Sequence, residues 1–469
     1  MDSSARLLVL VALGAILGLL AACGGGGGPR LAFDQGVASG DVTPTGVVLW
    51  TRVDQEDDVR AQVAKDESFK DLVVEGKQRS AADHDFGVTL GIEGLDPATR
   101  YYYRFLPPSG PASPVGTFQT APAFETAADV TFVYSGDSNA AFKPFQILSK
   151  MRDDDPAFLI YLGDTIYADD ETIGIPAATT LDAYRERYRI NREDEHLRGL
   201  LAATSTYAIW DDHEVTNDFA GQDVNPAMLA AGRQAFQEYL PIRQDSTDPG
   251  RLYRTFNWGK DVELFIPDER QYRSAEAICK DEKGATVSIP SIQGDAACKA
   301  GLADPSRTFL GREQMEWLKQ SLRSSTAKFK FIVNEVAISE LLLLPYDRWE
   351  GYAAERRELL DFLENNDIKN VIFLTTDLHA SIVNTVDQRY KEIIVGPIGT
   401  TPLGAELEAL GIPISLAQGL LPGVEYSNLD TFSYGLVHVT TGTTPARVQI
   451  EIKDLEGQVL YAVDIEEEG

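Results

Sequence analysis

The stretch from Phe158 to Tyr167 reads FLIYLGDTIY and decides the fold of the larger part of this chain. A continuous apolar run of this kind is typical of a strand that is buried on both faces, as in a parallel sheet covered by helices. The run ends on Gly163, which permits a tight turn, and on an aspartate. The stretch therefore predicts an α/β domain in which a carboxylate lies at the end of a buried strand.

The same pattern recurs through the second part of the chain. Further apolar runs with acidic or amide ends are VTFVYSGD (130–137), YAIWDDHE (207–214), VELFIPD (262–268), FIVNE (331–335) and VIFLTTDLH (371–379). Amphipathic helices are predicted between such runs, at Arg312–Arg323 and Ala353–Asn366. Ligands of α/β sheets bind outside the carboxyl ends of the strands. We therefore expect the acidic ends to meet at one site.

These carboxylates favour a metal centre, because an ionised carboxylate beside a hydrophobic strand is costly unless it is paired or bound to a cation. The chain has only five histidines and three cysteines, which excludes a zinc site built from four thiolates. Oxygen-rich ligands with few imidazoles suit hard cations such as Ca²⁺, Mn²⁺ or Fe³⁺.

The segment GDTIY (163–167) holds the sharpest candidates. The two oxygens of Asp164 suit it to bridge two metals, and Tyr167 follows three residues later, where a phenolate oxygen would favour a trivalent metal such as Fe³⁺. A turn aspartate and a half-buried tyrosine are the structural alternative. Asp377 and His379 lie two residues apart, on one side of an extended chain, and form a second pair of candidate ligands.

The segment DDHE (211–214) holds a candidate acid. His213 is expected to give a proton or to bind phosphoryl oxygens, and flanking carboxylates would raise its pKa. Asp212 and Asn217 are candidate metal ligands. For Glu214 we expect a salt bridge instead of a catalytic role. His84 lies in the predicted β-sandwich, His196 among charged residues of a helical stretch and His438 in a C-terminal strand, and we expect them to be structural or exposed.

Residues 33–120 have a different pattern, with short strands between turn residues and no helical period. Predicted strands are Gly46–Val53, Val59–Val63, Leu72–Val74, Val88–Ile92, Tyr101–Phe105 and Thr117–Gln119. They indicate an all-β sandwich of the fibronectin III or immunoglobulin type. Residues 121–129 are predicted to be a linker, and residues 130–469 the α/β domain.

The length of 469 residues agrees with two or three domains, and the net charge is −30. Such a surface repels the backbones of nucleic acids, so nucleic-acid binding is not expected. A phosphate substrate is still compatible, because bound metal ions reverse the sign of the field locally.

The N-terminus predicts export. Residues 7–20 form an apolar run that is shorter than the ~20 residues of a membrane span. Residues 1–22 thus resemble a bacterial lipoprotein signal peptide, with lipid on Cys23 and a glycine-rich tether over residues 23–32; an ordinary secretory signal is the alternative. No aspartate follows Cys23, which favours the outer over the inner membrane. Cys279 and Cys298 form a disulfide or remain two buried thiols.

Seven blocks of the chain, in order, resemble the alkaline phosphatase D (PhoD-like) family of metallophosphoesterases. They are FDQGVASGDVTPTGVVLWTRV (33–53), GLDPATRYYYRF (94–105), LGDTIY (162–167), IWDDHEVTND (209–218), PDERQYR (267–273), RTFLGREQMEWL (307–318) and DRWEGYAAERRELL (347–360). The resemblance implies a fibronectin-like sandwich followed by a calcineurin-like phosphoesterase domain, an αββα sandwich of four layers. It also implies hydrolysis of phosphate monoesters or diesters at a centre with Fe³⁺ and Ca²⁺.

The resemblance also implies roles for single residues. The positions that match the family's metal- and phosphate-binding residues are Asp164, Tyr167, Asp212, His213, Asn217, Asp377 and His379. The chain departs from the family at Asp137, where a cysteine iron ligand is frequent, so that other divalent metals come into question. It departs again at Thr376, where glycine is usual.

The expected mechanism is in-line attack on phosphorus by a metal-bound hydroxide, without a covalent enzyme intermediate. His213 would donate a proton to the leaving oxygen or stabilise the equatorial charge. Arg270 would contact the phosphate or pair with Asp268. Two other functions fit the same sequence: a non-catalytic surface lipoprotein with a degenerate metal site, and a phosphodiesterase that acts on phospholipids.

Overall fold

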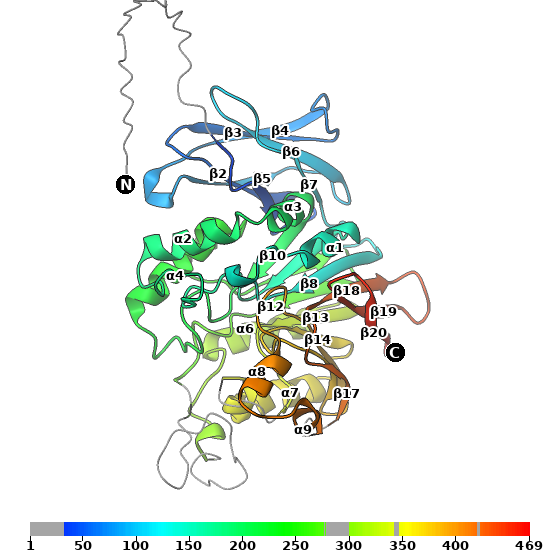
Figure 1. Cartoon of the computed structure of the whole chain (residues 1–469). Coiled ribbons are helices and arrows are strands. Elements are labelled where there is room, and N and C mark those ends of the chain that lie inside the picture. The colour runs from blue at the N-terminus through cyan, green and yellow to red at the C-terminus, as the bar shows by residue number, and fades with distance from the viewer. Residues whose placement is uncertain (1–31, 276, 278–299, 342–346, 420–422) are drawn as a thin grey trace, which may run out of the picture.

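The computed structural model describes residues 32–275, 277, 300–341, 347–419 and 423–469 (Figure 1). The predicted signal peptide (1–22), Cys23, Cys279 and Cys298 lie outside these ranges. Among the described residues, no helix is both long and apolar enough to cross a lipid bilayer.

Two large sheets face each other across the main core. The nine-stranded sheet has the order β20 (Val459–Glu466), β19 (Arg447–Asp454), β18 (Ser433–Thr440), β8 (Val130–Ser135), β9 (Phe158–Leu162), β10 (Ser205–Ile209), β1 (Val37–Gly40), β2 (Gly46–Arg52) and β5 (Gly87–Glu93). The seven-stranded sheet has the order β11 (Arg254–Trp258), β12 (Val262–Ile266), β13 (Phe329–Asn334), β14 (Val371–Thr375), β16 (Tyr390–Ile394), β15 (Ser381–Val386) and β17 (Val424–Asn428). Phe132 of β8 meets Phe331 of β13 edge to face, with ring centroids 5.4 Å apart. Aromatic contacts of this kind join the two sheets into one core.

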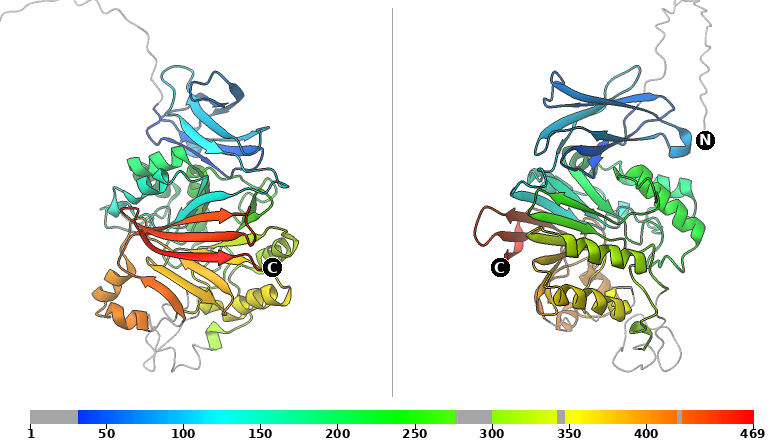
Figure 2. Two further views of the ribbon diagram at one scale, coloured as in Figure 1. Left: turned by 90° about the vertical axis from the view of Figure 1, so that its right-hand side faces the viewer. Right: turned by 180° about the vertical axis from the view of Figure 1, so that it is seen from behind.

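Helices cover the outer faces of both sheets (Figures 1 and 2). Those beside the nine-stranded sheet are α1 (Ile147–Asp153), α2 (Leu181–Asn191), α3 (Glu195–Ala203) and α4 (Pro226–Tyr239). Those beside the seven-stranded sheet are α6 (Arg312–Ser324), α7 (Ala353–Asn365), α8 (Leu403–Ala409) and α9 (Ile414–Gly419). Met315 and Leu318 of α6 and Leu359 of α7 are buried against Phe265 and Phe373 of the sheet. The expected αββα order of layers is confirmed, as are the helices predicted at Arg312 and Ala353.

The N-terminal strands form the layer at the top of Figure 1. A four-stranded sheet has the order β4 (Leu72–Arg79), β3 (Asp58–Ala64), β6 (Arg100–Leu106) and β7 (Gly116–Gln119). It lies over β1, β2 and β5, which belong to the nine-stranded sheet, and Gly40 of β1 pairs in parallel with Thr206 of β10. All six strands predicted in residues 33–120 are present. The sandwich therefore shares one of its sheets with the α/β part of the molecule.

The register of the strands brings the acidic ends together. Strands β8, β9 and β10 are mutually parallel neighbours, and so are β12, β13 and β14. The segments that follow them therefore emerge at the same edge of each sheet, as is usual for ligand sites of α/β folds.

Candidate metal centre

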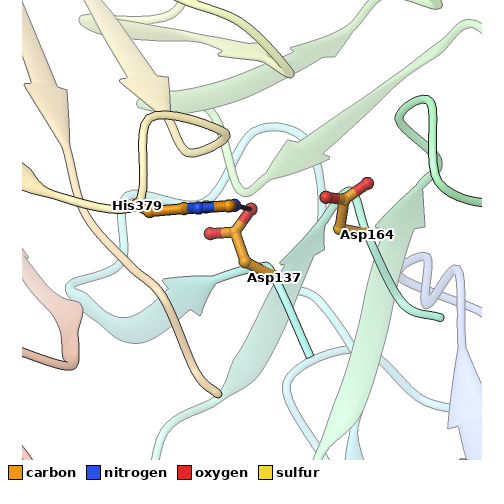
Figure 3. Close-up of side chains that lie close together, drawn as sticks. All are labelled: Asp137, Asp164 and His379. Atoms are coloured by element: carbon orange, nitrogen blue, oxygen red, sulfur yellow. Dashed lines mark ion pairs between the residues drawn. The ribbon is translucent and has the colours of Figure 1, made fainter. Parts of the chain in front are cut away.

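Three predicted residues from three different strand ends meet at this edge. Asp137 follows β8, Asp164 follows β9 and His379 follows β14, and one ligand atom from each lies within 4.8 Å of the other two. Figure 3 shows the Asp137 carboxylate beside the imidazole of His379, with the Asp164 carboxylate next to it. Both carboxylates are buried. This arrangement suits a metal ion with mixed oxygen and nitrogen ligands.

Asp164 also belongs to a second group of potential ligands. One of its atoms lies within 4.8 Å of atoms of Asp212 and His213, which follow β10. The bridging role predicted for Asp164 is compatible with its position, because Asp164 is common to both groups and carries two carboxylate oxygens.

The backbone at these positions is held in a conformation that few residues adopt. Asp137, Asp164, Asp377 and His379 have φ values of 63°, 48°, 64° and 51°. Left-handed backbone at a residue other than glycine costs free energy and is concentrated at functional sites. Gly163 precedes Asp164 with φ of 72°, and a Cβ there would lie 2.7 Å from Cβ of Asp211. The predicted need for glycine at this turn is thus explained by conformation and by space.

The electrostatics of the cluster fit a bound cation. Burial raises the pKa of Asp137 to about 7, and nearby Asp377 adds to this rise while His379 opposes it. Oδ2 of Asp137 is buried and has no hydrogen-bond partner. Burial also raises the pKa of Asp164 well above its usual range, helped by the charge of Asp212. Buried carboxylates without partners are unfavourable, and a metal ion is the partner that would relieve this cost.

Tyr167 links the two groups. Its hydroxyl lies 3.1 Å from Nε2 of His379, and its ring stacks on His213 with centroids 4.1 Å apart. Burial raises the pKa of Tyr167 well above its usual range, and the charges of Asp164 and Asp137 raise it further. A phenolate at this position therefore requires a strongly charged cation beside it.

His213 is held as a charged acid by residues on either side. Its Nδ1 lies 2.6 Å from Oδ1 of Asp169, whose Oδ2 accepts a hydrogen bond from the Asn217 N–H at 2.6 Å. Burial lowers the pKa of His213, but Asp212 and Asp169 outweigh this effect and raise it to about 10. Asn217 itself is exposed. Asp169 was not predicted, although its position two residues after Tyr167, in the same loop, is a usable signal.

Arg270 has neither of its two predicted partners, the phosphate or the Asp268 carboxylate, at its guanidinium. Its side chain has no exposure, and its Nη1 and Nη2 donate to Asp347 at 2.8 and 3.1 Å while Nε donates to Asp211. Asp268 accepts the backbone N–H of Arg270 but not its guanidinium, and its other hydrogen bonds come from Trp210 and Gln271. The nearest approach to a candidate ligand is 3.8 Å, between Nη2 and Oδ1 of Asp212. The phosphate contact expected for Arg270 is wrong, because the carboxylates of Asp211 and Asp347 enclose its guanidinium.

Two glutamates have partners that the sequence did not predict. The salt bridge expected for Glu214 is wrong: its carboxylate accepts from the N–H and hydroxyl of Thr165, at 2.6 and 2.5 Å, and from the N–H of Asp211 at 2.9 Å. It therefore ties the loop after β9 to the loop after β10. Glu406 of α8 lies 3.1 Å from Nδ1 of His379 and orients that ring. No local sequence signal singles out Glu406.

Asp377 lies beside the cluster, and its carboxylate is hydrogen-bonded to an arginine. Its charge and its backbone N–H both act on Asp137. Its carboxylate accepts hydrogen bonds from Nε and Nη2 of Arg348, at 3.1 and 2.9 Å. Neither of the two ligand groups found among the described residues includes Asp377.

Two family models and one curated relative match most of this chain. Residues 131–448 match the family model described as PhoD-like phosphatase, and residues 25–122 match the model of the PhoD-like phosphatase N-terminal domain. The chain is 30% identical over 420 residues to "Alkaline phosphatase D" of Bacillus subtilis (strain 168), covering 81% of this chain and 70% of that protein.

Solved structures share the fold. The structure titled "Structure of PhoD" aligns with a TM-score of 0.77 and 24% identity, over 94% of this chain and 90% of that one. A purple acid phosphatase from yellow lupin (Lupinus luteus) aligns with a TM-score of 0.59 and 11% identity, over 92% of this chain and 73% of that one.

Proposed function

The chain belongs to the PhoD-like phosphatase family and is a phosphoesterase, and on this premise we propose that its metal centre hydrolyses phosphate monoesters or diesters by direct attack of an activated water. The observation that carries the proposal is the position of Asp164, which belongs to both ligand groups and lies within reach of His213. A carboxylate shared by two metal positions, with a charged acid beside it, suits in-line hydrolysis of a phosphate ester by a metal-activated water.

The residues divide the work in this proposal. Metal ions, when bound, neutralise the phosphoryl oxygens and activate water for attack. Asp137, Asp164, Asp212 and His379 hold them. His213 keeps a proton at Nε2, because Nδ1 is engaged by Asp169, and it donates this proton to the leaving oxygen. Tyr167 stacks on His213 and limits the rotation of its ring.

We propose Fe³⁺ and Ca²⁺ as the metals. The site that contains Asp137, Tyr167 and His379 suits Fe³⁺, since a phenolate and a carboxylate are hard, charged ligands. The site that contains Asp164 and Asp212 offers carboxylate oxygens of the kind that Ca²⁺ prefers, and Asn217 is proposed as a further ligand there. Because Asp137 stands where the family frequently has a cysteine ligand, a divalent ion is the alternative to Fe³⁺ at the first site. Metal analysis of the purified full chain tests this assignment.

The decisive experiment replaces Asp164 by asparagine. Asparagine tolerates positive φ, so Asp164→Asn keeps the turn while removing a bridging charge. Turnover of 4-nitrophenyl phosphate should fall at least about a hundredfold, the loss typical when one group that stabilises charge in the transition state is removed, and metal content should fall with it. Asp155→Asn is the matched control, because Asp155 also has positive φ (47°) and is exposed. Wild-type turnover by the Asp164 variant would refute the proposal.

We also propose that the protein is exported and anchored to a membrane by lipid on Cys23. The support is the sequence Leu20-Ala21-Ala22-Cys23 at the end of an apolar run. Cys23→Ala should move the protein from the membrane fraction to the soluble fraction of its bacterial host. An unchanged membrane fraction would contradict the proposal.

A further inference from the structure

Asn191 is a buried asparagine that joins two of the loops that carry the candidate ligands. It is the last residue of α2 and is 2% exposed. Its Nδ2 donates to the carbonyl oxygens of Ser138 and Thr165, each at 2.8 Å. Because only the NH₂ group of the side chain can donate to two carbonyls, these contacts fix the orientation of the amide. One side chain from the helical layer thus holds the loop after β8 against the loop after β9.

The two acceptors of Asn191 come immediately after two candidate metal ligands. Ser138 follows Asp137 and Thr165 follows Asp164, and the two carboxylates are neighbours in Figure 3. A backbone hydrogen bond joins the same loops, from the N–H of Ser138 to the carbonyl of Asp164 at 2.9 Å. Through the two carbonyls that it binds, Asn191 therefore sets the separation of Asp137 and Asp164.

The conformation of these two loops depends on such support. Asp137 and Asp164 have φ values of 63° and 48°, and a residue other than glycine keeps a left-handed backbone only where the surrounding structure enforces it. Ser138 and Thr165 are both buried. Without the amide of Asn191, their carbonyl oxygens would lose a donor in a place where that loss is costly. The loops can reduce this cost only by moving, and the aspartates would move with them.

The end of α2 is itself fixed by the residue that follows Asn191. The guanidinium of Arg192 lies 4.3 Å from the ring centroid of Trp50 in β2, and its Nη2 donates to the carbonyl of Tyr239 in α4 at 2.7 Å. Helix α2 also packs on α4. A side chain can position other groups only if its own place is held by packing and hydrogen bonds, and Asn191 meets this condition.

We infer that Asn191 is a positioning residue that sets the spacing of Asp137 and Asp164 and thereby the affinity of the centre for its metal ions. The inference rests on the proposed function and concerns the metal centre of that same site. Because Asp164 belongs to both ligand groups, a shift of its loop alters both metal positions at once. Residues that orient metal ligands from outside commonly change metal affinity by about tenfold to a hundredfold when they are replaced.

The test measures Ca²⁺ binding by calorimetry to the full chain after treatment with EDTA. Asn191→Leu keeps a branched side chain but removes both donated hydrogen bonds, and we expect the Kd for Ca²⁺ to rise about tenfold or more. Asn191→Ser keeps one donor and should recover part of the affinity. Ser80→Ala is the matched control. The hydroxyl of Ser80 is buried in the N-terminal sandwich, where it accepts from the N–H of Asp57 at 2.9 Å and donates to the carbonyl of Gln55 at 2.8 Å.

Thermal unfolding and turnover separate positioning from general destabilisation. Asn191→Leu and Ser80→Ala should both lower the Tm of the metal-free protein, but only Asn191→Leu should weaken Ca²⁺ binding. Its kcat for 4-nitrophenyl phosphate should fall at limiting Ca²⁺ and recover at saturating Ca²⁺, with KM unchanged.

An unchanged Kd in Asn191→Leu would overturn the inference, and so would an equal rise of Kd in Ser80→Ala. Should Asn191→Leu not fold, Asn191→Ser is judged by the same comparison. If the wild type bound Ca²⁺ but hydrolysed no phosphate ester, the proposed function would fail, whereas the Ca²⁺ affinities would still decide the role of Asn191.

Discussion

At the scale of single residues, the centre is preformed by the backbone. Asp137, Asp164, Asp377 and His379 all have positive φ, which costs of the order of 1–3 kcal/mol at each residue. Neighbouring segments hold this conformation, since the N–H of Gly399 donates to the Asp137 carbonyl at 2.9 Å. The side chains therefore point into the site before any ligand binds.

The residues that the sequence identified are those that end a strand. Asp137, Asp164 and His379 each follow an apolar run, so a local pattern reveals them. Arg348 and Glu406 could not be found this way, because their roles depend on contacts with Asp377 and His379 that lie 29 and 27 residues away along the chain. Pairing across such distances is decided by the packing of the sheets and not by local sequence.

Asp169 provides a residue-scale prediction. Its carboxylate is one of the charges that raise the pKa of His213 to about 10. His213 is protonated below its pKa, so the acid role is available at neutral pH and is lost as the pH rises through that value. Asp169→Asn removes one charge and should shift the alkaline limb of the kcat profile to lower pH. Profiles measured between pH 6 and 11 check this, and an unshifted alkaline limb would count against the role of Asp169.

At the scale of elements, the turn after β9 is the most constrained part of the site. A Cβ at Gly163 would meet Asp211, and its φ of 72° is unfavourable for alanine. Gly174 has a similar φ of 81° but open space around it. These two glycines separate the effect of backbone strain from the effect of a steric clash.

We predict that Gly163→Ala lowers both Tm and turnover, whereas Gly174→Ala lowers only Tm, and by less. The strain of a left-handed backbone alone costs about 1–2 kcal/mol for alanine, and the clash at Gly163 must in addition displace Asp164 or Asp211. Thermal unfolding and 4-nitrophenyl phosphate turnover of both variants provide the measurement. Equal effects of the two substitutions would show that the close approach to Asp211 is unimportant.

The strands themselves were predictable, but their partners were not. Alternating and continuous apolar runs identified the strands of the N-terminal part and of the α/β part. The same pattern cannot tell that β1, β2 and β5 extend the sheet of β8, β9 and β10, because an apolar strand has the same local pattern whichever sheet it joins. The sheet that the N-terminal part and the α/β part share can therefore be recognised only in the three-dimensional structure.

At the scale of the whole molecule, this shared sheet predicts that the N-terminal part is required for stability. Trp50 of β2 is fully buried, and the guanidinium of Arg192 lies 4.3 Å from its ring centroid. Trp50→Ala removes this ring from the core and should cost about 3–5 kcal/mol. Denaturant unfolding checks the value, with exposed Phe124→Ala as the control. A loss below 1 kcal/mol would mean that the two parts are energetically independent.

The stability of the whole molecule should depend on pH in a way that metal reverses. The pKa of Asp137 is about 7 in the folded chain and near 3.8 when it is unperturbed. Between these values the unfolded chain has lost a proton that the folded chain retains, so stability falls as the pH rises from about 4 to about 7. Glu269 has a pKa of about 7 as well, also raised by burial, and adds to the same slope.

We therefore predict that the Tm of metal-free protein falls between pH 4 and 7, and that added metal raises Tm most above pH 7, where Asp137 is ionised and ready to bind it. Asp137→Asn should flatten the slope, leaving the part due to Glu269 and to other buried carboxylates such as Asp164, and should reduce the gain in Tm from metal. The thermal scans are run at constant ionic strength. Charge repulsion within this chain of net charge −30 is then comparable between variants. If the variant and the wild type had the same slope and the same gain from metal, Asp137 would not be the buried carboxylate that binds the ion.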